Sequence, residues 1–206
     1  MRPRYAILVD GGFMRTNLLR RPTKSFTADD VVRECDRLRS LPCVKDYELL
    51  RIFYYDAQAK DVELTAPVSG STYNAMNDDK FRNTRKLHDQ LILKPDFALR
   101  IGELSFAQSG WRLKPNVATK LAKQPRPLTD EDFTLNVQQK GVDMRIGMDM
   151  ARLALREMVR TVIVVTGDTD FVPAFKFMRR EGVRVILDLL GEQGRPELRQ
   201  HSDLVV

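Results

Sequence analysis

The chain has 206 residues, of which 43% are hydrophobic and 30% charged, so it can fill the core of one domain and is not expected to be disordered. Its formal net charge of +6 favours encounters with polyanions such as nucleic acid, although many soluble proteins are equally basic. No apolar run reaches the ~20 residues of a membrane span, and the apolar part of the opening segment is too short for a secretory signal, so we expect a cytoplasmic protein with no membrane partner.

The predicted elements alternate between strands and helices. The first half contains an apolar strand at 5–9, a helix that Thr27 caps and that ends before Pro42, a strand at 47–55, a helix at 77–93 and a strand at 97–104. The last third contains strands at 133–138, 162–165 and 183–189, with helices at 144–159 and 171–181 between them. Such alternation predicts parallel pairing with right-handed crossovers. We therefore expect an α/β fold, a three-layer α/β/α sandwich with a mostly parallel central sheet, in one domain over residues 1–206.

A basic segment at 108–132, rich in proline and lysine, is predicted to be an excursion over the surface. It contains an indole and several cations that could contact RNA, namely Trp111, Arg112, Lys114, Lys120 and Lys123. The cations would bind the phosphate backbone while the indole stacks on a base. A solvated loop anchored by a tryptophan explains the same composition.

Two apolar strands end in aspartates. Asp10 follows the first strand, and Asp168 and Asp170 follow the strand at 162–165. Because ligands of open parallel sheets bind at the carboxyl ends of the strands, we expect these side chains to converge. Each has a simpler explanation as well, since Asp10 could be a turn residue and Asp170 the N-cap of the following helix.

A third acidic element lies at the start of the helix that follows residue 140. Asp143 stands at the helix start, from which it can point to the strand ends, whereas Asp149 lies about 240° further round the helix and is a secondary candidate. Lys140 could meet a phosphate or be an ordinary exposed lysine.

Converging carboxylates repel one another unless a cation lies between them. Hard oxygen ligands favour Mg²⁺ or Mn²⁺, which can polarise a phosphodiester and activate water. The two cysteines, Cys35 and Cys43, and the two histidines, His88 and His201, are isolated in the sequence, so we expect neither a zinc site nor histidine-based catalysis.

Three segments resemble the NYN family, the LabA-like branch of the PIN-domain ribonucleases. They are ILVDGG at 7–12, QKGVDMRIGMDM at 139–150 and VTGDTDFVPAFKFMRREGVRV at 165–185. The resemblance implies a PIN-like fold and magnesium- or manganese-dependent cleavage of single-stranded or structured RNA. It implies that metal ligands or water-positioning groups are Asp10, Asp143, Asp168 and Asp170, with Thr166 as a polar neighbour and Asp149 less securely.

The first motif departs from the family at Phe13. The family commonly has an asparagine at this position, whereas in this chain Asn17 follows one helical turn later. One hydrogen bond of the site is therefore in question, which keeps open a catalytically weak or inactive RNA-binding or regulatory domain of the same fold. A phosphatase of the haloacid-dehalogenase type is a further alternative, but it needs an aspartate where this chain has Gly12. The sequence also leaves a homo-oligomer open.

Overall fold

The computed structural model describes residues 2–22, 26–59 and 61–206. By its internal contacts the chain divides into two compact units. The first unit comprises Met1–Asp56, Lys86–Ile101 and Gly141–Val206, and the second comprises Ala57–Arg85 and Gly102–Lys140. The aspartates that the sequence singles out all belong to the first unit.

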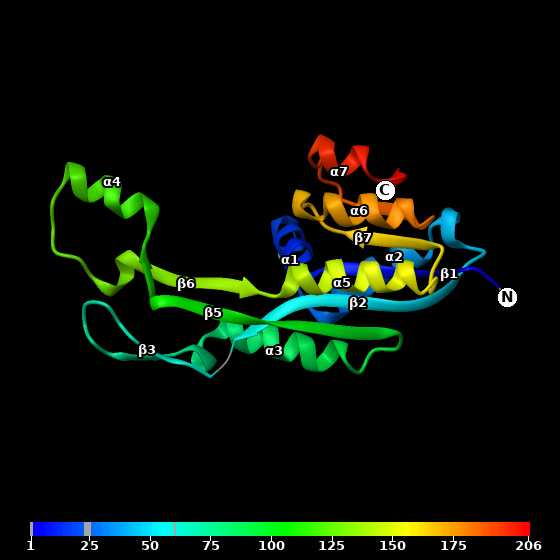
Figure 1. Cartoon of the computed structure of the whole chain (residues 1–206). Helices are drawn as coiled ribbons and strands as arrows, with labels where there is room; N and C mark the ends of the chain where they lie inside the picture. Colours follow the sequence, from blue (N-terminus) through cyan, green and yellow to red (C-terminus); the bar gives the residue numbers. More distant parts are fainter. Residues whose placement is uncertain (1, 23–25, 60) are drawn as a thin grey trace. The chain divides into compact units, whose positions relative to one another are not determined.

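The first unit is built on a parallel sheet (Figure 1). Its strands are β1 (Arg4–Asp10), β2 (Glu48–Ala59), β7 (Thr161–Val165), β8 (Arg184–Asp188) and β9 (Leu204–Val205), together with the start of β5 (Phe97–Leu113). Their order is β5-β2-β1-β7-β8-β9, and each pair from β2 to β9 is parallel. The register pairs Val9 of β1 with Val165 of β7, so these two strands end level with each other. Parallel pairing thus places the carboxyl ends of β1 and β7 side by side.

Helices follow the strands as an α/β fold requires. They are α1 (Gly11–Arg20), α2 (Ala28–Arg39), α3 (Asp79–Leu91), α5 (Val142–Leu155), α6 (Val172–Arg180) and α7 (Pro196–Gln200), with the short 3-10 turns η1 (Pro42–Val44) and η4 (Thr169–Phe171). The predicted cap at Thr27 is confirmed, because its hydroxyl accepts from the Asp30 N–H in a reciprocal capping box. In the part of the chain that the structure describes, no helix has the length and apolar character needed to cross a membrane.

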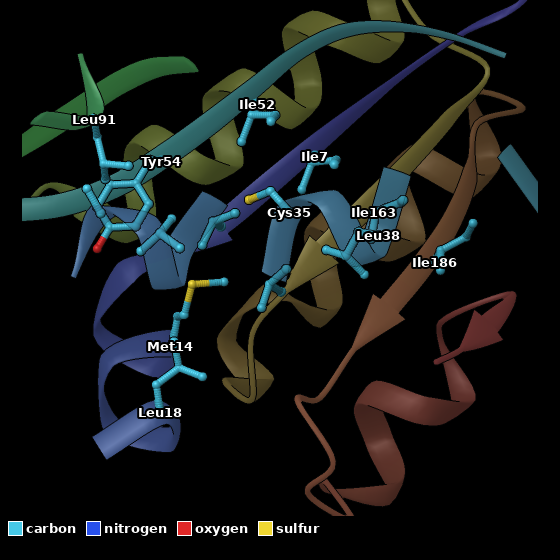
Figure 2. Close-up of a cluster of buried hydrophobic side chains, with 14 of the residues drawn as sticks. Ile7, Met14, Leu18, Cys35, Leu38, Ile52, Tyr54, Leu91, Ile163 and Ile186 are labelled. Atoms are coloured by element: carbon cyan, nitrogen blue, oxygen red, sulfur yellow. The ribbon is translucent and has the colours of Figure 1, made fainter. Parts of the chain in front are cut away.

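One face of the sheet carries a continuous hydrophobic core (Figure 2). Alternate residues of the strands, such as Ile7 and Ile163, are fully buried and pack with side chains from α1, α2 and α3. The intervening residues, such as Leu8 and Val164, are equally buried on the opposite face, and α5 and α6 pack against each other with buried apolar residues. Helices therefore cover both faces, and the predicted α/β class is confirmed.

The second unit is antiparallel. It contains β6 (Phe133–Lys140), which pairs antiparallel with β5, a hairpin of β3 (Glu63–Thr65) and β4 (Thr72–Asn74), the helix α4 (Pro115–Lys123), and the turns η2 (Ala75–Asn77) and η3 (Asp130–Asp132). Its small core is centred on Ala75 and Phe81. The segment at 108–132 therefore contains the end of β5, α4 and η3.

The sequence does not predict α1. Instead of a loop after Asp10, the helix begins at the next residue. Gly11 lies so close to β2 that a Cβ atom would be 2.7 Å from the Tyr54 ring. Only glycine fits this approach. The absence of a loop fixes Asp10 between the end of a strand and the start of a helix.

Truncation of a core residue tests the role of β7. Ile163→Ala should lower the free energy of unfolding by about 3 kcal/mol, because it removes fully buried methyl groups from the centre of the sheet. The measurement is urea-induced unfolding followed by circular dichroism. The control Leu155→Ala, at a side chain with 64% exposure, should cost less than about 1 kcal/mol; similar losses for both variants would contradict the assignment.

Candidate active site

Four aspartates gather at the carboxyl edge of the parallel sheet. Asp10 ends β1, Asp168 and Asp170 lie in the turn after β7, and Asp143 lies in the first turn of α5. Helix α5 packs against η4, which brings Asp143 to the turn that carries Asp170. The expected convergence of these four residues is therefore what the first unit shows.

Thr166 links the ends of β1 and β7. Its buried hydroxyl donates to Oδ2 of Asp10 at 3.2 Å and accepts from the Asp168 N–H at 3.2 Å. The other oxygen of Asp10, Oδ1, accepts from the Phe13 N–H at 3.0 Å, so Asp10 is the N-cap of α1. The position of Asp10 is thus fixed from both strands and from the helix.

The two aspartates after β7 have different roles in the backbone. Oδ1 of Asp168 accepts from the Asp170 N–H at 2.9 Å, which makes Asp168 the cap of η4. Helix α6 begins after Phe171, so the alternative that Asp170 is an N-cap is wrong. Among the described residues, the carboxylates of Asp143 and Asp170 have no hydrogen-bond or ion-pair partner. These two exposed side chains remain able to bind a ligand.

The carboxylates at this edge interact electrostatically. Burial raises the pKa of Asp10, while the Phe13 N–H and the Thr166 hydroxyl act in the opposite direction and the charge of Asp143 adds to the rise. Desolvation also raises the pKa of Asp143, with further contributions from the charges of Asp168 and Asp170. A cation at this edge would relieve the repulsion and favour the ionised forms.

The donor chemistry fits a hard divalent cation, but the side chains are not arranged as a finished ligand set. In the described part of the chain, no three histidine, cysteine, aspartate or glutamate side chains form a preorganised metal group. Asp10 and Asp168 each accept a hydrogen bond from a backbone N–H, whereas within the described residues no hydrogen bond holds Asp143 or Asp170. Rotation of Asp143 and Asp170 toward the other two would complete an all-oxygen site.

A groove of about 520 Å³ opens beside Asp10 and Asp168. Phe13 forms part of its wall, and its ring packs so closely on Gly167 that a Cβ atom there would lie 2.4 Å from the ring. Asn17 also lines the groove; its amide donates to the Phe13 carbonyl at 2.9 Å, and its Oδ1 has no partner among the described residues. The amide of Asn17 therefore bonds to the helix backbone. The contact of Phe13 with Asp10 is made by its backbone N–H and not by its side chain.

Arginines and a glutamate also line this groove. Arg20 pairs with Glu192 at 3.3 Å, with both side chains largely exposed. Arg195 lines the groove too and, within the residues described, has no carboxylate partner. The groove thus combines the carboxylates of Asp10 and Asp168 with two arginines.

Asp149 has partners of its own, away from the four aspartates. Asp149 accepts from the Tyr55 hydroxyl and from Nε of Arg100, each at 2.9 Å, beside a different small cavity. This agrees with the helical spacing, which separates Asp149 from Asp143. Lys140 is an exposed residue at the end of β6, in the second unit.

The predicted RNA contacts of the second unit divide into a packed tryptophan and exposed cations. The indole of Trp111 lies edge-on against Tyr73 at a centroid distance of 5.3 Å, and its buried Nε1 has no partner within the described residues. Lys114 donates to the Glu131 carbonyl at 2.7 Å. The exposed cations are Arg112, Lys120 and Lys123. Trp111 therefore has a packing role in this structure.

The sequence analysis does not predict one buried polar cluster. Asp56 of β2 is fully buried and bonds to Arg15 of α1 at 2.8 Å and to Nε2 of His88 at 3.0 Å. His88, which is isolated in the sequence, therefore lies against a carboxylate in the fold. The available signal was an aspartate directly after the predicted strand at 47–55, since a carboxylate that becomes buried must be paired. The cluster fixes α1, and with it the helix start that holds Asp10.

The sequence profile of the NYN domain matches residues 103–205, which is half of the chain. The chain belongs to the NYN domain family. The matched region contains Asp143, Asp168 and Asp170, while Asp10 precedes it. The predicted family is thus confirmed.

A solved structure shares the fold of this NYN domain. It is the crystal structure of a protein of unknown function from Vibrio parahaemolyticus, which is 16% identical and superimposes with a TM-score of 0.54. The match covers 100% of this chain and 92% of the other chain. No curated protein matches the sequence. The structural match therefore supports the fold but identifies no activity.

Removal of the buried carboxylate tests whether the polar cluster stabilises the domain. Asp56→Ala should lower the free energy of unfolding by about 3 kcal/mol, because it leaves the partly buried Arg15 and the buried His88 without this acceptor. Urea-induced unfolding measures the loss. As a control, Asp36→Ala removes an exposed partner of Arg39 and should cost less than about 1 kcal/mol; an equally small loss for Asp56→Ala would show that the cluster contributes little.

Proposed function

We propose that this NYN domain is a metal-dependent ribonuclease that hydrolyses RNA phosphodiester bonds with Mg²⁺ or Mn²⁺. The observation that carries the proposal is the gathering of Asp10, Asp143, Asp168 and Asp170 at one edge of the sheet, where their charges act on one another. Membership of a PIN-like nuclease family supports nuclease activity in general. The metal, the RNA substrate and the residue roles are parts of the proposal.

The four aspartates would hold the ion, which when bound would polarise the phosphate and activate a water molecule. The protein's own residues would hold two of these carboxylates in position. Thr166 and the Phe13 N–H hold the carboxylate of Asp10, and the Asp170 N–H holds that of Asp168. These fixed hydrogen bonds orient two carboxylates in advance, so that less reorganisation is needed when substrate arrives.

The arginines of the groove would bind the charged backbone of the substrate. Arg195 and Arg20 line the same groove as Asp10 and Asp168, whose charges would otherwise repel a polyanion. Arginine suits phosphate because its planar guanidinium donates two parallel hydrogen bonds. The groove can therefore bind a phosphate group next to the carboxylates.

The substitution Asp168→Asn tests the catalytic proposal. Cleavage of labelled RNA should fall by orders of magnitude, because the amide lacks the negative charge that binds a cation, while its oxygen can still accept from the Asp170 N–H and preserve the turn. Gel-based cleavage assays with manganese measure the loss. Glu181→Gln, an exposed change at the far end of α6, is the matched control and should leave the rate unchanged; parental activity in purified Asp168→Asn would assign the cleavage to another site or to contamination.

Thermal unfolding tests metal binding without any substrate. Saturating Mn²⁺ should raise the melting temperature by about 5 °C or more, because a ligand that binds only the folded state stabilises it. Asp168→Asn should remove the rise, while Glu181→Gln should retain it. The same rise in all three proteins would locate metal binding away from this edge.

The side chain of Phe13 in the groove favours a second candidate, an RNA-binding domain without turnover. It would bind RNA without cleaving it and would show no manganese-dependent stabilisation. A cleavage assay on a panel of labelled RNA and DNA, with and without manganese, separates the two functions. Release of phosphate from a small monoester would instead support the phosphatase alternative, which the NYN family membership does not favour.

A further inference from the structure

A second surface hollow lies in the first unit, between the end of α6 and the start of β8. Its volume is about 650 Å³. Four cations and one carboxylate line it, namely Lys176, Arg179, Arg180, Arg184 and Asp203. We name these residues the basic hollow; none of them belongs to the candidate active site.

The single carboxylate of the basic hollow is already bound. Asp203 accepts from Nε of Arg179 at 2.8 Å and, through its other oxygen, from the Val185 N–H at 2.8 Å. Lys176, Arg180 and Arg184 have no carboxylate partner among the described residues. The hollow therefore keeps a surplus of positive charge.

A neighbouring histidine interacts with two cations of the hollow. The pKa of His201 is lowered, first by desolvation and then by the positive charges of Lys176 and Arg179. The smaller contribution from the two cations agrees with a positive potential in the hollow. An anion bound in the hollow would reduce this potential.

The sheet register places the basic hollow at the amino edge, opposite the carboxylates. Arg184 is the first residue of β8, and its N–H donates to the carbonyl of Arg160, just before β7. The Arg160 N–H donates in turn to the carbonyl of Arg4, the first residue of β1. Three adjacent parallel strands therefore begin with an arginine at or beside their first residue.

Helix α6 connects the two edges. It follows Asp170 and ends at Arg180, a length of about 14 Å at 1.5 Å per residue. Pro173, Lys176 and Arg180 are exposed at spacings that place them on one helix face. An extended strand with one end at the carboxylates would thus pass Pro173 and then meet the basic hollow, at Lys176 first and at Arg180 after it.

We propose that the basic hollow binds backbone phosphates of the RNA substrate, away from the bond that is cut, with the strand lying along the exposed face of α6. The ligand assignment rests on the proposed function. Arginine forks and a lysine match phosphate oxygens, and a repeating polyanion can engage several cations of the hollow together. An acidic protein segment is the competing ligand, and the experiment includes it.

Binding is tested without catalysis, in the Asp168→Asn protein with EDTA. Arg180→Glu combined with Arg184→Glu should weaken binding of a fluorescein-labelled single-stranded RNA about tenfold at low salt, measured by fluorescence anisotropy. The plot of log affinity against log salt has a negative slope, and the magnitude of this slope should also decrease by about 1.4, because two phosphate contacts are lost at ~0.7 each. Thermal unfolding checks that the variant is folded, and single Arg180→Gln and Arg184→Gln variants should show smaller losses in the same direction.

The control pair Arg33→Glu and Lys86→Glu changes the net charge equally at exposed sites outside the hollow. It should change the affinity less than threefold, about 0.6 kcal/mol. Equal losses for both pairs would overturn the proposal, since net charge alone would then explain binding. Competition by poly-glutamate as effective as by unlabelled RNA would also overturn it, because the hollow would then recognise negative charge in general.

Cleavage kinetics separate this proposal from the proposed function. With the aspartates intact, Arg180→Glu combined with Arg184→Glu should raise KM for a long RNA and leave kcat unchanged, because a distant contact contributes equally to substrate and transition state. An oligonucleotide too short to span α6 should show little change in KM. If no protein cleaves RNA but binding still depends on the two arginines, the nuclease proposal fails and the proposal that the basic hollow binds RNA is retained. If RNA is cleaved and KM for long RNA is unchanged in the double variant, the proposal for the basic hollow is overturned.

Discussion

The in-register parallel pairing of β1 with β7 is the constraint on which the candidate site depends. Because Val9 and Val165 are level, the residues that follow them leave the sheet at the same point, and Thr166 can bond to Asp10 while it accepts from the Asp168 N–H. A one-residue slip would turn every side chain of the strand to the other face. The hydrophobic pattern that buries both strands therefore also determines where the carboxylates meet.

Burial and the mutual repulsion of the carboxylates at this edge disfavour the ionised forms that catalysis would use. The raised pKa values of Asp10 and Asp143 express this conflict, which the protein resolves only in part through N–H groups and one hydroxyl. Such partial compensation is typical of functional sites, whereas carboxylates kept only for stability are usually fully paired. Asp56, bonded to both Arg15 and His88, is the contrasting case in the same unit.

The sequence predicted the features that depend on local periodicity and on strand ends. The alternating strands, the Thr27 cap and the approach of four aspartates all follow from patterns within short segments. It did not predict α1, since a helix that starts with two glycines and has a weak apolar stripe lacks the local pattern of a helix, and the close approach of Gly11 to Tyr54 joins segments that are distant in the sequence. The pairing of Asp56 with His88 and the packing of Trp111 on Tyr73 also join distant segments, which no single-sequence pattern reveals.

Arginines stand at or beside the beginnings of β1, β7 and β8, whereas Asp10 ends β1 and Asp168 and Asp170 follow β7. These residues form a local charge separation along the strands. In the proposed RNA complex this separation would exert a torque that turns the arginine end toward an approaching polyanion. Added salt screens that torque and should slow association before it affects any short-range contact.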